Sequence, residues 1–75
     1  MQSEIYDLLM VRKKLCARQV VDEFKCSRPS ANSSLLKLER FFTNNIKTQY
    51  EQERIGKSIY SVKYYIYIEW FSINH

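Results

Sequence analysis

The side chains best suited to bind another molecule are basic or carry hydroxyls, and they gather in the middle of the chain. Arg28 is the strongest candidate for reading a base, because a guanidinium can donate two parallel hydrogen bonds to guanine. Three nearby hydroxyls can exchange hydrogen bonds with phosphates and bases, those of Ser27, Ser30 and Ser33. Lys37 and Arg40 add positive charge further along. These residue types favour contact with nucleic acid.

Catalytic and metal chemistry have little support in the sequence. The single histidine is His75, no Gly-rich phosphate loop is present, and no base lies within motif reach of either cysteine. Cys16, Cys26 and His75 fall short of the four ligands of a structural zinc site. We therefore expect no enzyme activity, no metal and no cofactor. A helix between the cysteines would hold them too far apart for a disulfide, with Cys26 buried in a turn and Cys16 more accessible.

The positive charge is concentrated in one stretch of the chain. The net charge is +4, from twelve Lys and Arg against eight Asp and Glu. The stretch from Arg12 to Arg28 holds six basic residues and only two acidic ones, Asp22 and Glu23. A local basic excess attracts polyanions such as nucleic acid, although a solvated helix face has the same composition.

The first half of the sequence has helical periodicity. A first helix is expected from Ser3 to the basic run that starts at Arg12, and a second from about Ala17 to Phe24. Ser27 is expected to cap a third helix, with Pro29 in its first turn. Four apolar residues of that helix share a face at helical spacing: Ala31, Leu35, Leu38 and Phe42.

Burying that apolar face directs the polar residues of the third helix outward. Four of them are expected on the exposed surface: Ser30, Ser33, Lys37 and Arg40. Arg28 and Lys37 are both expected opposite Leu35. Small polar residues near the N-terminal end would let the helix approach base edges closely in a major groove.

The second half of the sequence favours strands. Thr, Tyr, Ile and Val dominate from Ile46 onward, and Gly56 is the natural turn of a hairpin. Arg54 and Lys57 flank that turn, where cations suit contact with DNA. Past the turn, alternation assigns one apolar face to Tyr60, Val62, Tyr64, Ile66, Ile68 and Trp70. The opposite face would expose aromatic side chains that a second copy could cover, so we expect a homodimer through Tyr65, Tyr67 and Phe71.

The segment from Leu15 to Arg40 resembles the helix-turn-helix of winged-helix regulators, as in MarR-like and ArsR-like proteins and small regulators of archaeal viruses and plasmids. The resemblance rests on paired aliphatic residues in one helix, a turn with one buried residue, a Ser-Arg-Pro-Ser opening, and a leucine-rich helix ending in Leu-Glu. The matching residues are Val20, Val21, Cys26, Ser27 to Ser30, Leu35, Leu38 and Glu39. The resemblance implies an α+β fold, a winged helix-turn-helix of three helices followed by a β-hairpin wing.

We therefore expect one domain over residues 1–75, with the helix-turn-helix at about 16–42 and the wing hairpin at about 46–70. Its expected function is sequence-specific binding of double-stranded DNA, as a transcriptional regulator. The DNA-binding residues would be Ser27, Arg28, Ser30, Ser33, Lys37, Arg40, Arg54 and Lys57. With no apolar run of about 18 residues and no leader pattern, we expect an intracellular protein without a membrane partner.

Two alternatives remain open from the sequence. A winged-helix adaptor that binds protein instead of DNA is favoured by Leu36, on the flank of the third helix, and by Glu51 and Glu53 in the hairpin. A single-stranded nucleic-acid binder would stack bases on the tyrosine-rich strand.

Overall fold

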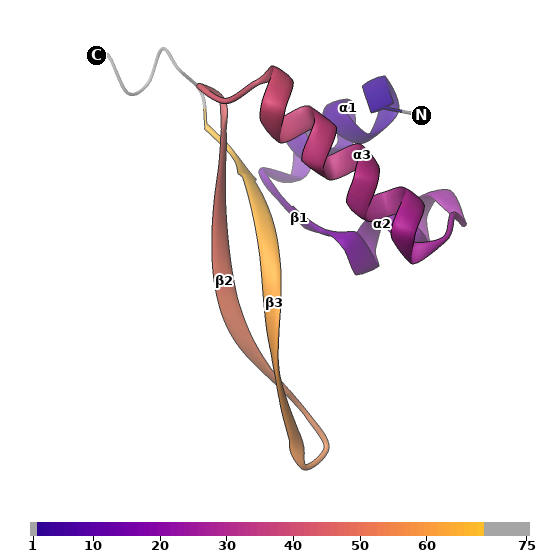
Figure 1. Ribbon diagram of the computed structural model, residues 1–75, viewed down its shortest axis with the longest axis vertical. Coiled ribbons are helices and arrows are strands. Elements are labelled where there is room, and N and C mark those ends of the chain that lie inside the picture. The colour runs from indigo at the N-terminus through magenta and orange to yellow at the C-terminus, as the bar shows by residue number, and fades with distance from the viewer. Residues whose placement is uncertain (1, 69–75) are drawn as a thin grey trace.

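The computed structural model describes residues 2–68 and has an α+β fold, in which three helices pack against a three-stranded antiparallel sheet (Figure 1). The elements in chain order are α1 (Gln2–Arg12), β1 (Lys14–Cys16), α2 (Ala17–Phe24), α3 (Arg28–Phe41), β2 (Ile46–Ile55) and β3 (Ser58–Tyr67). The helices gather at one end, and the β2–β3 hairpin extends far beyond them. Among the described residues, no helix is long and apolar enough to span a bilayer.

The core lies where the helices meet the base of the hairpin. Its buried residues come from every element: Ile5, Leu9, Leu15, Ala17, Val20, Ala31, Leu35, Leu38, Ile46 and Tyr65. Full burial of one such aliphatic side chain stabilises the fold by about 1.5–3 kcal/mol. The inner face predicted for the third helix is confirmed at Ala31, Leu35 and Leu38. Phe42 instead follows the last residue of α3, is exposed, and stacks on Tyr6, with ring centroids 4.2 Å apart.

Two lysines end the first two helices in the left-handed conformation. Lys13 has φ +70° and its N–H donates to the Leu9 carbonyl at 2.7 Å. Lys25 has φ +55° and donates in the same way to Val21 at 2.9 Å. This conformation is uncommon for residues other than glycine. The two lysines turn the chain into β1 and toward α3 respectively.

The short strand β1 is a feature that the sequence pattern did not predict. It pairs with β3 through Lys14↔Ile66, Leu15↔Tyr65 and Cys16↔Tyr64, so β3 is the central strand and the order is β1-β3-β2. Leu15 is fully buried in the core. The strand therefore fixes the base of the hairpin to the helical layer.

The hairpin itself confirms the prediction of two strands around Gly56. Pairing runs without interruption from Ile46↔Tyr67 to Ile55↔Ser58. Gly56 has φ +63°, a conformation that costs glycine little and side-chain-bearing residues more. The expected hairpin bound at residue 70 lies outside the described residues.

The two faces of β3 are the reverse of the prediction. Tyr65 is only 3% exposed and lies in the core, and Tyr67 packs against the core with its ring edge-on to Tyr6. Tyr65 is therefore too buried to face a second copy, contact of the half-buried Tyr67 with one stays a prediction, and Phe71 lies outside the described residues. Both faces of the strand are rich in apolar groups. Alternation therefore could not show which face the helices cover, and a one-residue shift exchanges the faces.

The expected accessibility of the thiols is also reversed. Cys16 is 5% exposed and Cys26 is half-buried, and both are free. Cys16 is buried because it belongs to β1 and also precedes α2, where its N–H donates to Gln19 Oε1 at 3.0 Å.

Candidate nucleic-acid interface

The helix α3 begins at the surface, and Ser27 determines where. The Ser30 N–H donates to Ser27 Oγ at 3.3 Å, and the two hydroxyl oxygens lie 3.0 Å apart in a second hydrogen bond. Pro29 occupies the first turn, where a missing N–H costs nothing. Ser27 is thus confirmed as the cap. The two hydroxyls contact each other, and Arg28 is the first residue of an exposed helix end.

The polar residues expected on the outside of α3 are exposed, which confirms the prediction for Ser30, Ser33, Lys37 and Arg40. Arg28 is also exposed, but it does not share a face with Lys37. Nine residues separate them, which is about 180° around a helix at ~100° per residue. Arg28 lies on the side next to the hairpin, so the expectation that both project opposite Leu35 is wrong for Arg28.

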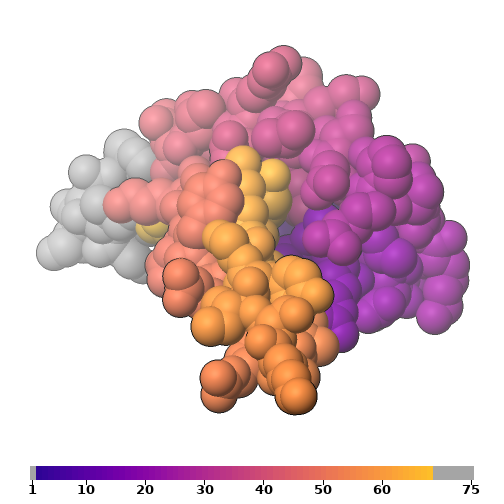
Figure 2. Space-filling model, turned by 60° about the horizontal axis from the view of Figure 1, so that its bottom comes forward, coloured from indigo at the N-terminus to yellow at the C-terminus, as the bar shows by residue number. Residues whose placement is uncertain are grey.

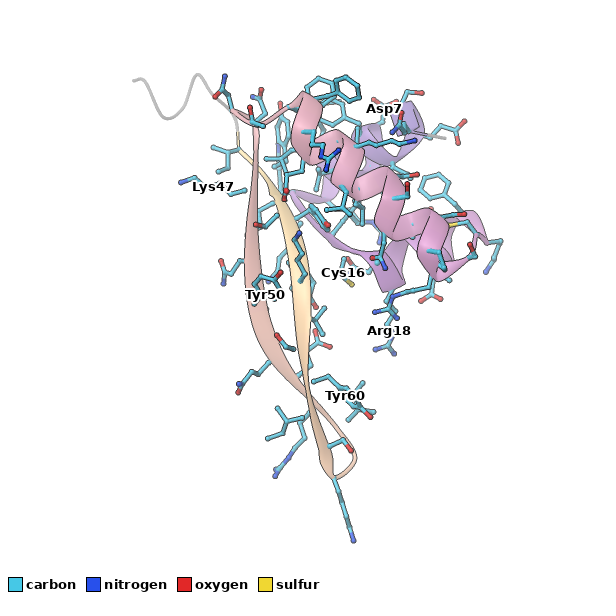
Figure 3. All side chains as sticks on the ribbon, in the orientation of Figure 1. Asp7, Cys16, Arg18, Lys47, Tyr50 and Tyr60 are labelled. Carbon is cyan, nitrogen blue, oxygen red and sulfur yellow. The ribbon has the colours of Figure 1, made fainter. Side chains whose placement is uncertain are left out.

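A groove of about 570 Å³ separates the start of α2 and α3 from the outer part of the hairpin. Arg18, Arg28 and Asp22 line its helical side, and Tyr60, Tyr64 and Glu53 line its hairpin side. In Figure 2 the tip of the hairpin is turned toward the viewer, and the helices lie beside the hairpin. In Figure 3, Tyr60 points away from the hairpin toward the side on which α2 lies, and Arg18 extends from α2 on that same side. Neither arginine forms an ion pair with any residue from 2 to 68.

Sequence reasoning missed Arg18 as a candidate. Its closeness to Arg28 depends on how the turn between α2 and α3 folds. Asn32, one turn after Arg28, lines an adjoining part of the groove. One sequence signal could have indicated Arg18. Arg18 and Arg28 each lie within the first two residues of consecutive helices.

The two carboxylates of the hairpin are both engaged within the protein. Lys14 Nζ donates to Glu51 Oε2 at 2.5 Å and lies 4.4 Å from the centre of the Tyr64 ring. The Tyr64 hydroxyl donates to the Glu53 carboxylate. Glu51 is therefore partly neutralised by a lysine on another strand, which lessens the acidity of the hairpin.

The hydrogen bond to Glu53 also alters Tyr64 itself. Because the bond is made by the protonated phenol, it raises the pKa of Tyr64 to about 12, and burial adds to the effect. Tyr64 therefore remains a neutral donor across the physiological pH range.

Arg54 and Lys57 lie at the far tip of the hairpin, apart from the start of α3 (Figure 1). Both are exposed, and neither pairs with an acidic group in the described part of the chain. Ile55 and Ile59 beside them are also exposed. The structure thus brings Ser27, Arg28 and Ser30 together and leaves the tip as a separate basic element.

One ion pair joins α3 to the hairpin. Lys63 Nζ lies 3.8 Å from Glu39 Oε2 and 5.0 Å from the centre of the Tyr65 ring. The contact joins the last turns of α3 to the middle of β3. It thereby helps to set the angle between the helix and the hairpin.

Within residues 2–68, no cluster of His, Cys, Asp and Glu has the make-up of a metal site. Comparison of the chain with family models, with curated proteins and with solved structures finds no match.

Proposed function

We propose that this protein is a winged helix-turn-helix regulator of transcription that binds double-stranded DNA. In this proposal α3 is the recognition helix and the β2–β3 hairpin is the wing. The observation that carries it is the groove beside the exposed start of α3, where Arg18 and Arg28 stand without ion-pair partners among the described residues. Unpaired guanidinium groups at a helix start suit phosphates and base edges.

Each basic residue has a distinct role in the proposal. Arg28 reads a guanine in the major groove, because it is at the N-terminal end of the helix that enters. Arg18 contacts a phosphate beside that groove, and Lys37 and Arg40 contact backbone further along. Arg54 and Lys57 bring the tip of the wing to a neighbouring stretch of backbone.

Stacking of single strands on the tyrosines is less well supported. Tyr65 is buried, and Tyr64 is covered by Lys14. Tyr50 and Tyr60 are exposed, but they lie on opposite faces of the hairpin. Tyr50 shares a face with its partner Lys63, and Lys63 is three residues from Tyr60 on β3, where successive side chains alternate between the two faces. Two rings on opposite faces do not form one stacking platform.

Protein binding without DNA is favoured by two exposed apolar side chains on α3, since Leu36 is 44% exposed and Phe41 is 76% exposed. They lie five residues apart, about 140° around the helix, and apolar side chains exposed singly are common on protein surfaces. They therefore do not displace the duplex proposal.

The test is selection of bound fragments from random duplex DNA, followed by affinity measurements on the selected site. Arg28→Ala is expected to cost about 1–3 kcal/mol on that site and to relax the preference at one base pair. Arg18→Ala is expected to weaken binding to all duplexes alike, because a phosphate contact carries no sequence information.

Arg12→Gln is the matched control. Arg12 is an exposed arginine at the end of α1, paired with Glu23 at 3.3 Å, and it does not line the groove. Its replacement is expected to leave DNA affinity unchanged. Selection that yields no enriched sequence, together with equal affinities for the parent and both groove variants, would contradict the proposal and favour the adaptor.

A further inference from the structure

The outer edge of β2 is a long, regular strand edge with no neighbouring strand among the described residues. The strand order is β1-β3-β2, so one side of β2 pairs with β3 and the other side is open (Figure 1). Its register with β3 is continuous over 10 residues, and the strand contains neither Pro nor Gly. Bulges, prolines and very short edge strands are common protections against pairing with another chain, and β2 has none of these three. Charged side chains are a further protection, and β2 does carry them, so any partner strand must place opposite charges against them.

The side chains along this edge are accessible. From Lys47 to Ile55 every residue is exposed or half-exposed, and Tyr50 is 67% exposed. Figure 3 shows Lys47 extending outward from the edge, away from the helices. A second strand could therefore approach without displacing any described element.

We propose that β2 pairs antiparallel with β2 of a second copy of this chain, with the twofold axis passing beside Tyr50. The two three-stranded sheets then form one continuous sheet. In such a pair, residues equally distant from Tyr50 along the strand stand directly opposite each other.

The charges of β2 are complementary in this arrangement. Lys47 stands opposite Glu53 of the second copy, and symmetry repeats that pair on the other side of the axis. Gln49 stands opposite Glu51 of the second copy, and because its amide already donates to Glu51 of its own chain at 3.4 Å, this position neither favours nor opposes the pairing. Opposite charges at facing positions stabilise a pair of strands, and like charges destabilise it.

Neighbouring registers that keep the same faces together are less favourable. A shift of two residues in one direction brings Glu51 directly opposite Glu51 of the second copy, which is repulsive. The opposite shift faces Lys47 with Glu51, whose charge Lys14 already partly neutralises, and it shortens the paired stretch. The Glu53 carboxylate, by contrast, accepts a hydrogen bond from a neutral phenol and keeps its charge for Lys47. The register centred on Tyr50 is therefore the one that the charges specify.

The first test is a charge exchange measured by sedimentation at micromolar concentration. Lys47→Glu and Glu53→Lys each create two like-charged pairs, so each is expected to weaken dimerisation about tenfold or more. The double variant K47E/E53K recreates opposite pairs and is expected to restore the dimer. The restored dimer also shows that loss of the Glu53 contact with Tyr64 does not unfold the chain. Lys57→Glu makes the same charge change in the turn, outside the paired stretch, and is expected to leave dimerisation unchanged.

The second test is cross-linking, in a background with Cys26→Ser. Tyr50→Cys places two thiols opposite each other across the axis, within the range of a disulfide, and is expected to form a covalent dimer. Thr48→Cys leaves the two thiols about 13 Å apart along the strands and is expected to remain monomeric on oxidation. A parent chain that is monomeric at every concentration, or Thr48→Cys that cross-links as readily as Tyr50→Cys, would overturn the proposal.

Discussion

At the scale of single residues, much of the charge on the hairpin serves to fix the hairpin in place. Lys14, Glu51, Tyr64 and Glu53 form a chain of contacts that crosses all three strands. Exposed ion pairs are individually worth about 0–1 kcal/mol, so the network contributes orientation more than stability. Within residues 2–68, the cations of the groove and of the hairpin tip are among those without an ion pair, so a polyanion can reach them.

Tyr64 provides a spectroscopic test of that network. Its pKa in the folded protein is raised to about 12 from an ordinary value of 10, so its contribution to stability is fully present below pH 10 and is lost as pH rises through 12. Absorbance titration of the phenols is expected to show a late ionising tyrosine that disappears in Tyr64→Phe. Tyr64→Phe that removes only a step near pH 10 would show that the hydrogen bond to Glu53 does not form.

The residue scale also shows where sequence reasoning ends. Arg28 was predicted because helix capping by Ser27 and Pro29 marks its position from local sequence. Arg18 was not, because the groove it lines is built by five elements, β1, α2, α3, β2 and β3, and the two strands of the hairpin are more than 30 residues away in the chain. Its role depends on tertiary packing that no local pattern records.

At the scale of elements, α3 is held in place by a cap that can be removed without touching its groove-lining arginine. Ser27→Ala removes the acceptor of the Ser30 N–H and is expected to lower the free energy of unfolding by about 1 kcal/mol. Chemical denaturation measures this directly. The control is Ser33→Ala, an exposed mid-helix change that is expected to leave stability unchanged or slightly raised. Equal stability of the parent and Ser27→Ala would mean that the cap does not define the start of α3.

The elements differ in how far their sequence predicts them. The second and third helices and the hairpin were predicted, because capping residues, helical spacing and Gly56 are local signals. The strand β1 was not, since its three residues show no periodicity and it exists through pairing with β3, about 50 residues later. The faces of β3 were reversed for a related reason. Aromatic groups stand on both faces, and only the position of the helices decides that Tyr65 is buried.

At the scale of the whole molecule, the two proposed surfaces lie on different sides of the hairpin. The groove with Arg18 and Arg28 lies between the hairpin and the helices, and the open edge of β2 lies on the side away from them (Figure 1). A second copy bound at the edge would leave the groove open. We therefore expect the charge-exchange variants of β2 to retain contact with DNA through each separate chain.

The salt dependence of duplex affinity tests the proposed function most directly. Binding through phosphates releases counterions, so the logarithm of the association constant should fall linearly and steeply with the logarithm of salt concentration. Arg18→Ala is expected to reduce that slope by about one, whereas Arg12→Gln leaves it unchanged. A duplex affinity that does not change with salt, or a slope that Arg18→Ala does not alter, would contradict DNA binding through this groove.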